Sequence, residues 1–234
     1  MPIDPAKEHF DLLASSYDAW KTRAAYYYDL LTEIYRERIQ PGVSVLEVGC
    51  GTGTLLARMQ PARGVGIDIS SKMIEIAARK YPDIEFHVRD ISTFHFKETF
   101  DFIMVPDVIE HLHDVAGAFA SLRNACGEGT KLMVTCVNPL WAPVMHLAER
   151  MGWKMPEGDH RWLSKKTIVA IAASEGFLLG DHYGRILLPK KVPLLSSLLN
   201  GLSRRFRFLS PICLIHVYLF VPNLSQGANR TRIG

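Results

Sequence analysis

The chain has 234 residues, of which 48% are hydrophobic and 22% are charged, and its formal net charge is +3. This length and composition are those of one ordinary globular domain with a sizeable core, and they exclude a mainly disordered chain. The net charge is too small to indicate nucleic acid. Residues 182–234, however, contain no Asp or Glu and several Lys and Arg, which indicates an anionic partner such as a membrane surface, an acidic substrate or nucleic acid.

The first expected element is a helical segment over residues 4–40. It is rich in aromatic side chains, and Pro41 and Gly42 end it before the first strand. The aromatic residues of this segment include Phe10, Tyr17, Trp20, Tyr26, Tyr27 and Tyr28.

A strand, a glycine turn and a helix follow. Residues 43–48 form a β-branched apolar run, which predicts a buried parallel strand, and 54–60 has apolar residues at helical spacing. Between them, Gly49, Gly51 and Gly53 allow a tight turn and the close approach of a ligand to the backbone. This unit is the usual cradle for an adenosine-type cofactor.

The residues around the turn disfavour a dinucleotide. A dinucleotide fingerprint needs G-x-G-x-x-G, and Thr54 stands where its last glycine belongs. Glu47, two residues before the first glycine, would repel a pyrophosphate and attract a cation. An NAD-dependent enzyme is therefore disfavoured.

The rest of the chain alternates between strands and helices, which predicts a doubly wound α/β sheet. The expected strands are 64–68, 84–89, 100–105, 130–136, 177–184 and 212–221, and the expected helices are 71–80, 114–125 and 165–175. We expect one domain over 1–222 and a disordered tail over the polar residues 223–234.

The second expected strand ends in Asp68, 17 residues after Gly51. A carboxylate there can accept hydrogen bonds from both hydroxyls of a ribose. The alternative is that Asp68, followed by Ser70, caps the next helix.

The sequence E-V-G-C-G-T-G at 47–53 resembles motif I of the class I S-adenosylmethionine-dependent methyltransferases. The segments 10–20 and 100–112 resemble the Methyltransf_11-like subgroup, which includes the ubiquinone-biosynthesis O-methyltransferases. The resemblance implies a Rossmann-like sheet of seven strands in the order 3-2-1-4-5-7-6 with the last strand antiparallel. It also implies a helical lid over 1–40 and small insertions after strand 5 and between strands 6 and 7.

The cofactor implied by the resemblance is S-adenosyl-L-methionine. In this family the acidic residue at Glu47 lies near the cationic methionine end, Asp90 accepts the adenine amino group, the next amide contacts the ring, and Tyr17 closes over the cofactor. The predicted cofactor-binding residues are Tyr17, Glu47, Gly49, Gly51, Gly53, Asp68, Ile69, Asp90, Ile91 and Val105. The alternatives are that Tyr17 only packs its helix on the sheet and that Asp90 is a solvated strand end.

Asp107, Glu110 and His111 follow the fourth strand and are the predicted catalytic residues, because the resemblance places them beside the transferable methyl group. Three interpretations stay open. The residues could hold Mg²⁺ against a substrate oxygen, His111 could act as a general base or contact the substrate, or Asp107 could simply cap a helix. We assign no metal site. His160 is a weaker candidate for substrate contact.

The expected activity is methyl transfer to a small-molecule acceptor, at an oxygen of a partly apolar metabolite or lipid-linked intermediate. No N-P-P-[YF] motif follows the fourth strand, which argues against a base in nucleic acid as acceptor. The Trp- and Met-rich insertion 138–162 and the Leu-rich basic region 187–209 are expected at the substrate side of the sheet. Region 187–209 is also a candidate for peripheral membrane contact. The alternative function is a cofactor-binding regulatory or assembly subunit without turnover.

The cysteines and the termini indicate a cytoplasmic protein. The four cysteines show no C-x-x-C or metal-ligand spacing, so we expect reduced thiols. The first residues show no apolar stretch of a secretory signal, and the longest apolar run, 208–221, is too short to span a bilayer.

Overall fold

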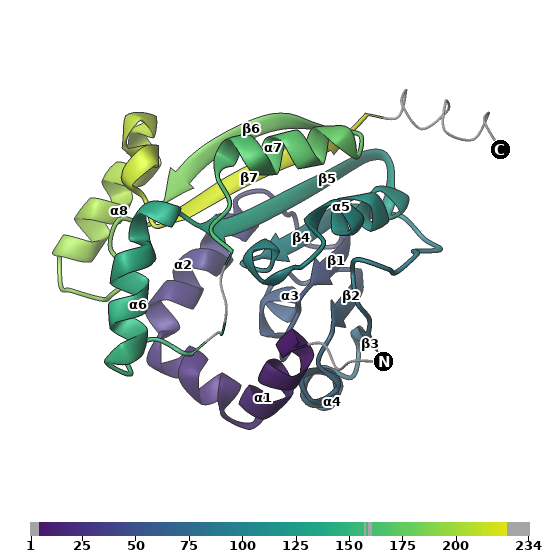
Figure 1. Ribbon diagram of the computed structural model, residues 1–234, viewed down its shortest axis with the longest axis horizontal. Coiled ribbons are helices and arrows are strands. Elements are labelled where there is room, and N and C mark those ends of the chain that lie inside the picture. The colour runs from purple at the N-terminus through teal and green to yellow at the C-terminus, as the bar shows by residue number, and fades with distance from the viewer. Residues whose placement is uncertain (1–4, 157, 159–160, 224–234) are drawn as a thin grey trace.

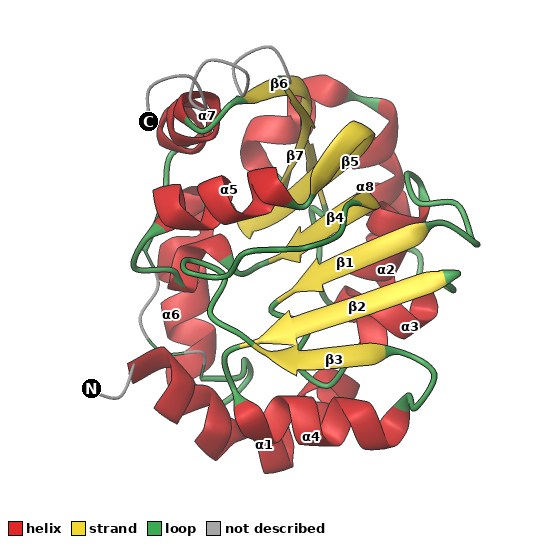
Figure 2. Ribbon diagram, turned by 90° about the vertical axis from the view of Figure 1, so that its right-hand side faces the viewer, coloured by secondary structure: helices red, strands yellow, loops and turns green. Residues whose placement is uncertain are grey.

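The computed structural model describes residues 5–156, 158 and 161–223, so the predicted tail and His160 lie outside the described residues, apart from Asn223. Its centre is a seven-stranded sheet in the order β3-β2-β1-β4-β5-β7-β6 (Figures 1 and 2). The strands are β1 (Ser44–Val48), β2 (Arg63–Asp68), β3 (Glu85–Val88), β4 (Phe100–Pro106), β5 (Cys126–Val137), β6 (Phe177–Arg185) and β7 (Ile215–Pro222).

The predicted topology is confirmed. The pairs β1–β2, β1–β4, β2–β3 and β4–β5 are parallel, whereas β7 lies antiparallel between β5 and β6. Consequently β6 runs in the same direction as β1 to β5, and these six strands end at one edge of the sheet. The segments after β4, β5 and β6 therefore start from the edge that bears the glycine loop.

The helices are α1 (Pro5–Arg23), α2 (Ala25–Arg36), α3 (Thr54–Arg58), α4 (Ser71–Lys80), α5 (Val115–Asn124), α6 (Ala142–Arg150), α7 (Lys165–Ser174) and α8 (Leu195–Arg205). Three short 3-10 helices are η1 (Ile109–His111), η2 (Pro139–Trp141) and η3 (Arg207–Ile212). Within the described part of the chain, no helix combines the length and the apolar character needed to cross a membrane.

Alternating residues of the central strands supply two cores, one on each face of the sheet. In β1, Leu46 and Val48 pack in the cluster that includes α5 and α7, whereas Val45 packs in the cluster that includes α2 and α3. This division follows from the alternation of side chains along a strand, and it explains why the buried parallel strand β1 is apolar apart from Ser44 at its start and Glu47.

The sequence prediction of the elements needs three corrections. The helical segment 4–40 is two helices, which meet at Ala24. β5 begins at Cys126 rather than 130, because its pairing with β4 extends through an irregularity between Phe100 and Phe102. For the two insertions the sequence analysis assigned no elements, and they contain α6 and α8.

Candidate functional site

The glycine loop between β1 and α3 is held in a left-handed conformation. Gly49, Gly51 and Gly53 have φ values of 66°, 53° and 76°. A Cβ at Gly49 would lie 2.3 Å from Cγ2 of Val108, and one at Gly53 would lie 2.6 Å from Cζ of Phe86. These three positions therefore need glycine both for the backbone conformation and for the close approach of neighbouring groups.

Tyr17 of α1 lies over this loop. Its ring carbon Cε1 is 2.9 Å from the position of a Cβ at Gly51. The same helix is tied to the loop and to α4 by two carboxylates: Asp18 accepts a hydrogen bond from Thr52 Oγ1 (2.7 Å), and Asp11 accepts one from Ser70 Oγ (2.6 Å). The structure thus places α1 where a lid over the loop is predicted to lie.

Asp68 links the end of β2 to the glycine loop. Its Oδ2 accepts a hydrogen bond from Gly51 N (2.9 Å), and its Oδ1 accepts one from Ser70 N (2.8 Å). Burial raises the pKa of Asp68, although these two N–H groups lower it. The capping role considered for Asp68 belongs to Ser70, whose side chain accepts from Met73 N at the start of α4 (3.1 Å).

Glu47 is 2% exposed, and its Oε2 accepts a hydrogen bond from Leu56 N (2.9 Å). Burial raises the pKa of Glu47 to about 8, against the opposing effects of the Lys21 ammonium and of the Leu56 N–H. A buried carboxylate at this place favours a cation beside it.

A cation does lie there. The Lys21 ammonium is 4.5 Å from the ring centroid of Tyr17 and 4.9 Å from that of Tyr28, a geometry for cation–π attraction. Burial lowers the pKa of Lys21, whereas Glu47 and Asp18 raise it. The sequence analysis missed Lys21, because nothing in a single amphipathic helix shows which of its lysines turns toward a carboxylate 26 residues away.

The remaining predicted cofactor-binding residues lie on both sides of β1, because Ile69, Asp90 and Ile91 follow β2 and β3 whereas Val105 belongs to β4. Asp90 is exposed, and its Oδ1 accepts from Ser92 N (2.8 Å). Ile91 and Val105 are buried, and Ile69 is half-buried. The adenine contact of Asp90 stays a prediction, as does its alternative as a solvated strand end.

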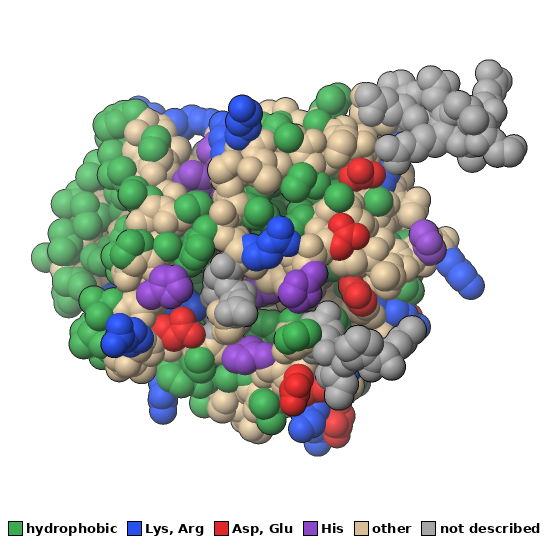
Figure 3. Space-filling model, in the orientation of Figure 1, with side chains coloured by type: hydrophobic (Ala, Val, Ile, Leu, Met, Phe, Trp, Pro, Cys, Tyr) green, Lys and Arg blue, Asp and Glu red, His purple; other side chains and the backbone are tan. Residues whose placement is uncertain are grey.

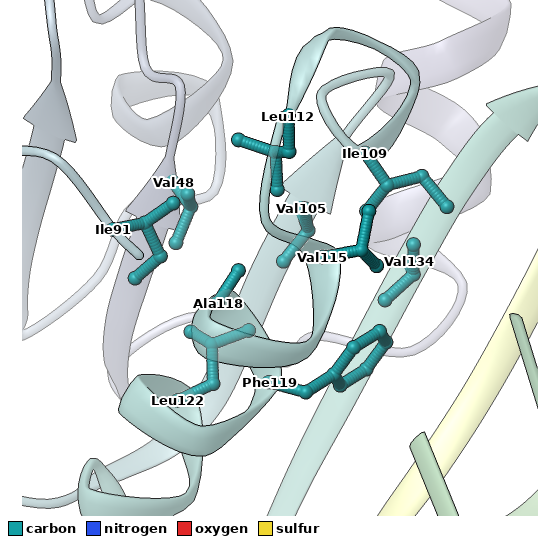
Figure 4. A pocket seen from close by; sticks show the side chains of 10 residues that line it. All are labelled: Val48, Ile91, Val105, Ile109, Leu112, Val115, Ala118, Phe119, Leu122 and Val134. Carbon is teal, nitrogen blue, oxygen red and sulfur yellow. The ribbon is translucent and has the colours of Figure 1, made fainter. Parts of the chain in front are cut away.

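A small apolar crevice lies beside these residues, within the core between the carboxyl half of the sheet and α5. Its volume is about 10 Å³, at most the space of one water molecule. Figure 4 shows its side chains turned toward one another from β1, β4, β5, η1, α5 and the segment after β3. The lining residues are Val48, Ile91, Val105, Ile109, Leu112, Val115, Ala118, Phe119, Leu122 and Val134.

Asp107, at the end of β4, has a φ of 52°, which is unusual for a residue with a side chain. Its Oδ2 accepts from Tyr27 OH (2.5 Å) and its Oδ1 from Thr135 Oγ1 (2.8 Å), and Tyr35 OH lies 3.3 Å from that threonine oxygen. The capping interpretation of Asp107 is wrong, because its carboxylate is engaged by α2 and β5, while Val108 precedes η1 and Asp114 caps α5.

Glu110 and His111 lie in η1, close to α1 and β5. Glu110 is 5% exposed, and its Oε1 accepts from Val137 N (3.2 Å). The His111 ring meets the Phe10 ring edge to face, with centroids 5.6 Å apart. Among the described residues, no three His, Cys, Asp or Glu side chains gather closely enough to hold a metal ion.

Residues 19–179 match the family model described as "Methyltransferase domain". The chain belongs to this family. Its methyl donor is S-adenosyl-L-methionine, the cofactor of these methyltransferases. The residues fit that group: three glycines leave room against the backbone, and two carboxylates, the buried Glu47 and the half-buried Asp68, lie at the ends of adjacent strands.

Individual relatives of this methyltransferase act on different atoms. It is 33% identical over 116 residues to a dTDP-4-amino-2,3,4,6-tetradeoxy-D-glucose N,N-dimethyltransferase of Saccharopolyspora spinosa, covering 48% of this chain and 47% of that protein. It is 30% identical over 135 residues to a ubiquinone biosynthesis O-methyltransferase of Rhodopseudomonas palustris, covering 52% and 51%. The chain thus matches about half the length of these curated relatives.

Solved structures show the same fold. A methyltransferase of Thermotoga maritima, described as a possible histamine N-methyltransferase, aligns with a TM-score of 0.70 at 16% identity, over 92% of this chain and 99% of that one. The N-methyltransferase NodS of Bradyrhizobium japonicum, solved with S-adenosyl-L-homocysteine, aligns with a TM-score of 0.59 at 17% identity, over 94% and 100%.

Within this methyltransferase, the structure brings most of the predicted residues to one edge of the sheet. It also adds residues that the sequence did not single out, chiefly Lys21, Tyr27 and Thr135. Tyr27 and Asp107 are 80 residues apart, and their contact depends on how α2 crosses the end of β4. Only the aromatic run at 26–28 offered a signal, and that run is equally typical of a packing face.

Proposed function

We propose that this methyltransferase transfers a methyl group to an oxygen of a small, partly apolar acceptor, a metabolite or a lipid-linked intermediate. The observation that carries the proposal is the pair Asp107 and His111 after β4, two side chains that can accept a proton. The His111 ring contacts Phe10 of α1, and the Asp107 carboxylate accepts hydrogen bonds from Tyr27 and Thr135. These side chains follow Val105, a buried residue near the end of β4.

When bound, S-adenosyl-L-methionine supplies an electrophilic methyl group on a sulfonium sulfur, which an oxygen lone pair displaces in line. The chain's own task is to position the acceptor, exclude water and remove the hydroxyl proton. His111 is the proposed proton acceptor. Asp107 is a proposed substrate contact, because two hydroxyl donors fix its carboxylate.

Apolar walls support an acceptor with apolar parts. The insertion after β5 brings Trp141 and Met145 against the core that contains α2 and α3. Met155 of the same insertion is buried. Water exclusion by such side chains strengthens the electrostatic effect of His111 and Asp107 on the reacting oxygen.

The test is a methylation assay with radiolabelled cofactor against phenols, catechols and matched primary amines. We expect methyl ethers as products. His111→Ala should lower kcat by about 100-fold, the effect of losing a general base. His146→Ala is the matched control, because His146 is exposed on α6.

The pH profile separates a base from a merely positioning residue. With His111 as base, the wild-type kcat rises with pH as the base loses its proton, and the His111→Ala rate lacks this step. Methylated amines as the only products, or an unchanged rate for His111→Ala, would overturn the proposal.

A second candidate function is a cofactor-binding subunit without turnover. It is supported by the position of Tyr17 over Gly51 and of the Lys21 ammonium beside Glu47, because both cover the glycine loop. Calorimetric binding of S-adenosyl-L-homocysteine, together with no methylation of any acceptor in the panel, would favour this function over the first.

A further inference from the structure

Helix α8 buries polar residues and exposes apolar ones, which is the opposite of a normal surface helix. Its buried residues are polar: Ser196, Asn200 and Ser203. Two of its four leucines face solvent, with Leu195 46% exposed and Leu198 60% exposed, whereas Leu199 and Leu202 are half-buried. A helix on a globular protein ordinarily buries its apolar stripe and exposes its polar one, so the reversal needs a reason.

The reversed orientation is fixed by hydrogen bonds. Asn200 Oδ1 accepts from Leu187 N (2.9 Å) and Leu188 N (3.0 Å), and its Nδ2 donates to Leu188 O (2.9 Å) and Tyr26 OH (3.2 Å). Ser196 Oγ donates to Val192 O (2.9 Å). The polar face is therefore satisfied within the protein, and the outward turn of the two exposed leucines is part of the fold.

Helix α6 exposes a second apolar face. None of its residues is buried, and Val144 and Leu147, three positions apart, are 51% and 58% exposed. Leu140 before the helix and Trp153 after it are 62% and 60% exposed. Residues at this spacing share one side of a helix.

The two helices contribute to one surface. The Lys190 ammonium, in the segment before α8, lies 4.4 Å from the ring centroid of Trp153, in the segment after α6. Trp141 Nε1 donates to Ile212 O (3.0 Å), which joins the start of α6 to η3. Figure 1 shows α6 and α8 at the same end of the molecule, and Figure 3 shows hydrophobic side chains gathered there.

We name this surface the apolar face. Its members are the exposed hydrophobic residues Leu140, Val144, Leu147, Met151, Trp153, Val192, Leu194, Leu195, Leu198, Phe206, Phe208 and Ile212. A contiguous exposed apolar area of this extent marks an interaction site.

The charged residues around the apolar face favour an anionic partner. Lys190, Lys191 and Arg205 are exposed beside the leucines of α8, and the described residues give them no acidic partner. Arg204, in contrast, is paired with Glu33 and Glu37. No Asp or Glu occurs from 182 to 234, and Glu149 is the one acidic residue of α6. The face is thus apolar with a cationic margin.

We propose that the apolar face docks this methyltransferase onto an anionic phospholipid bilayer. Leucines and a tryptophan enter the interfacial region, while lysine and arginine heads stay at the level of the lipid phosphates, the arrangement of an interfacial amphipathic surface. The face follows the carboxyl ends of β5 and β6, the edge of the sheet that also bears Asp107 and His111. The proposal does not rest on the acceptor proposed above.

The experiment is flotation of the full chain with vesicles of phosphatidylcholine alone and of phosphatidylcholine mixed with phosphatidylglycerol. We expect at least about tenfold more bound protein with the anionic vesicles, and a loss of that excess as salt screens the charges. Equal recovery with both vesicles, or no flotation at all, would overturn the proposal.

Variants separate the apolar from the cationic contribution. Leu194→Asp with Leu198→Asp, and separately Lys190→Glu with Lys191→Glu, should each reduce binding to anionic vesicles at least about tenfold. The matched controls are Leu178→Asp, at a 53% exposed position in β6, and Lys131→Glu, exposed in β5. Wild-type binding by both the leucine variant and the lysine variant contradicts the proposal.

Folding and self-association are checked on the same proteins. Circular dichroism should be unchanged in the leucine variants, because both side chains are exposed. Light scattering gives the mass in solution: a dimer that the leucine variants dissociate would show that a second copy of this chain covers the face, and the membrane proposal would be wrong.

Discussion

At the scale of single residues, Glu47 is a buried carboxyl group whose protonation changes with burial. Burial raises its pKa to about 8 from an ordinary value of 4.5. The folded protein therefore keeps a proton in this pH range that the unfolded chain has released. By linkage, Glu47 makes the free energy of unfolding fall as the pH rises from about 4.5 to about 8.

Glu47→Gln should remove this dependence. Melting temperatures of the cofactor-free protein, measured between pH 5 and 8, are expected to fall more steeply in the wild type than in the Gln variant. Glu128→Gln, at an exposed position in β5, is the control and should follow the wild type. Parallel curves for Glu47→Gln and the wild type would show that Glu47 is ionised in the folded state throughout.

Gly51 offers a test of the contact between Tyr17 and the glycine loop. Gly51 and Gly129 both have positive φ, at 53° and 87°, but a Cβ at Gly129 meets nothing within 4 Å. Gly129→Ala should therefore cost only the backbone strain, about 1–2 kcal/mol. Gly51→Ala adds a clash with the Tyr17 ring and should weaken binding of S-adenosyl-L-homocysteine, measured by calorimetry, whereas Gly129→Ala should not.

At the scale of elements, α1 is held closed by polar contacts rather than by a large apolar face. Only Leu13 and Ala14 of this helix are buried, while Asp18 bonds Thr52 (2.7 Å) and Lys80 (2.8 Å). Elements with few buried apolar contacts open locally at low free-energy cost. Helix α1 is therefore the part of the site most suited to admit a ligand.

Asp18→Asn removes the charge that Lys80 and Thr52 engage. Hydrogen exchange of residues 5–23 should become faster by about fivefold or more, since a lost charge-assisted hydrogen bond is worth roughly 1–2 kcal/mol at a partly exposed site. The control is Asp29→Asn, which breaks the exposed ion pair between Asp29 of α2 and Arg58 of α3. If α1 exchanges at the wild-type rate in Asp18→Asn, the polar contacts do not hold it.

The sequence predicted local features of the site and missed those formed between distant elements. The glycine turn and the carboxylates at Glu47 and Asp68 are encoded by short patterns, because a strand, a turn and a helix are neighbours in the chain. Lys21 comes close enough to act electrostatically on Glu47 only through the docking of α1, and Tyr27 contacts Asp107 only through the crossing of α2. Such contacts depend on packing that no short window contains.

The same reason explains the outcome for the insertions. Both follow strands that end at the edge of the sheet bearing the glycine loop, as strand direction requires, and their contact with substrate stays a prediction. No helix was predicted at α8, although its leucines have helical spacing. The sequence does not show that this helix buries Ser196 and Asn200.

At the scale of the whole molecule, the antiparallel strand β7 joins the parallel sheet to its last strand. It pairs with β5 on one side and β6 on the other. Phe220 of β7 packs against Phe119 of α5, with ring centroids 5.7 Å apart, and against Phe177 of β6, at 6.4 Å. This aromatic cluster connects residues about 100 positions apart, so the core completes only when the end of the chain is in place.

Phe220→Ala should therefore destabilise the entire domain. Phe220 is 1% exposed, and removing a buried phenylalanine costs about 3–5 kcal/mol through lost burial and the cavity that remains. Val221, the next residue, is 42% exposed, so Val221→Ala should change the free energy of unfolding by less than about 1 kcal/mol.

Urea unfolding followed by both fluorescence and circular dichroism measures the two variants. For Phe220→Ala we expect the two transitions to coincide at a lower urea midpoint. A separate early transition would mean that β6 and β7 unfold independently of β1 to β5.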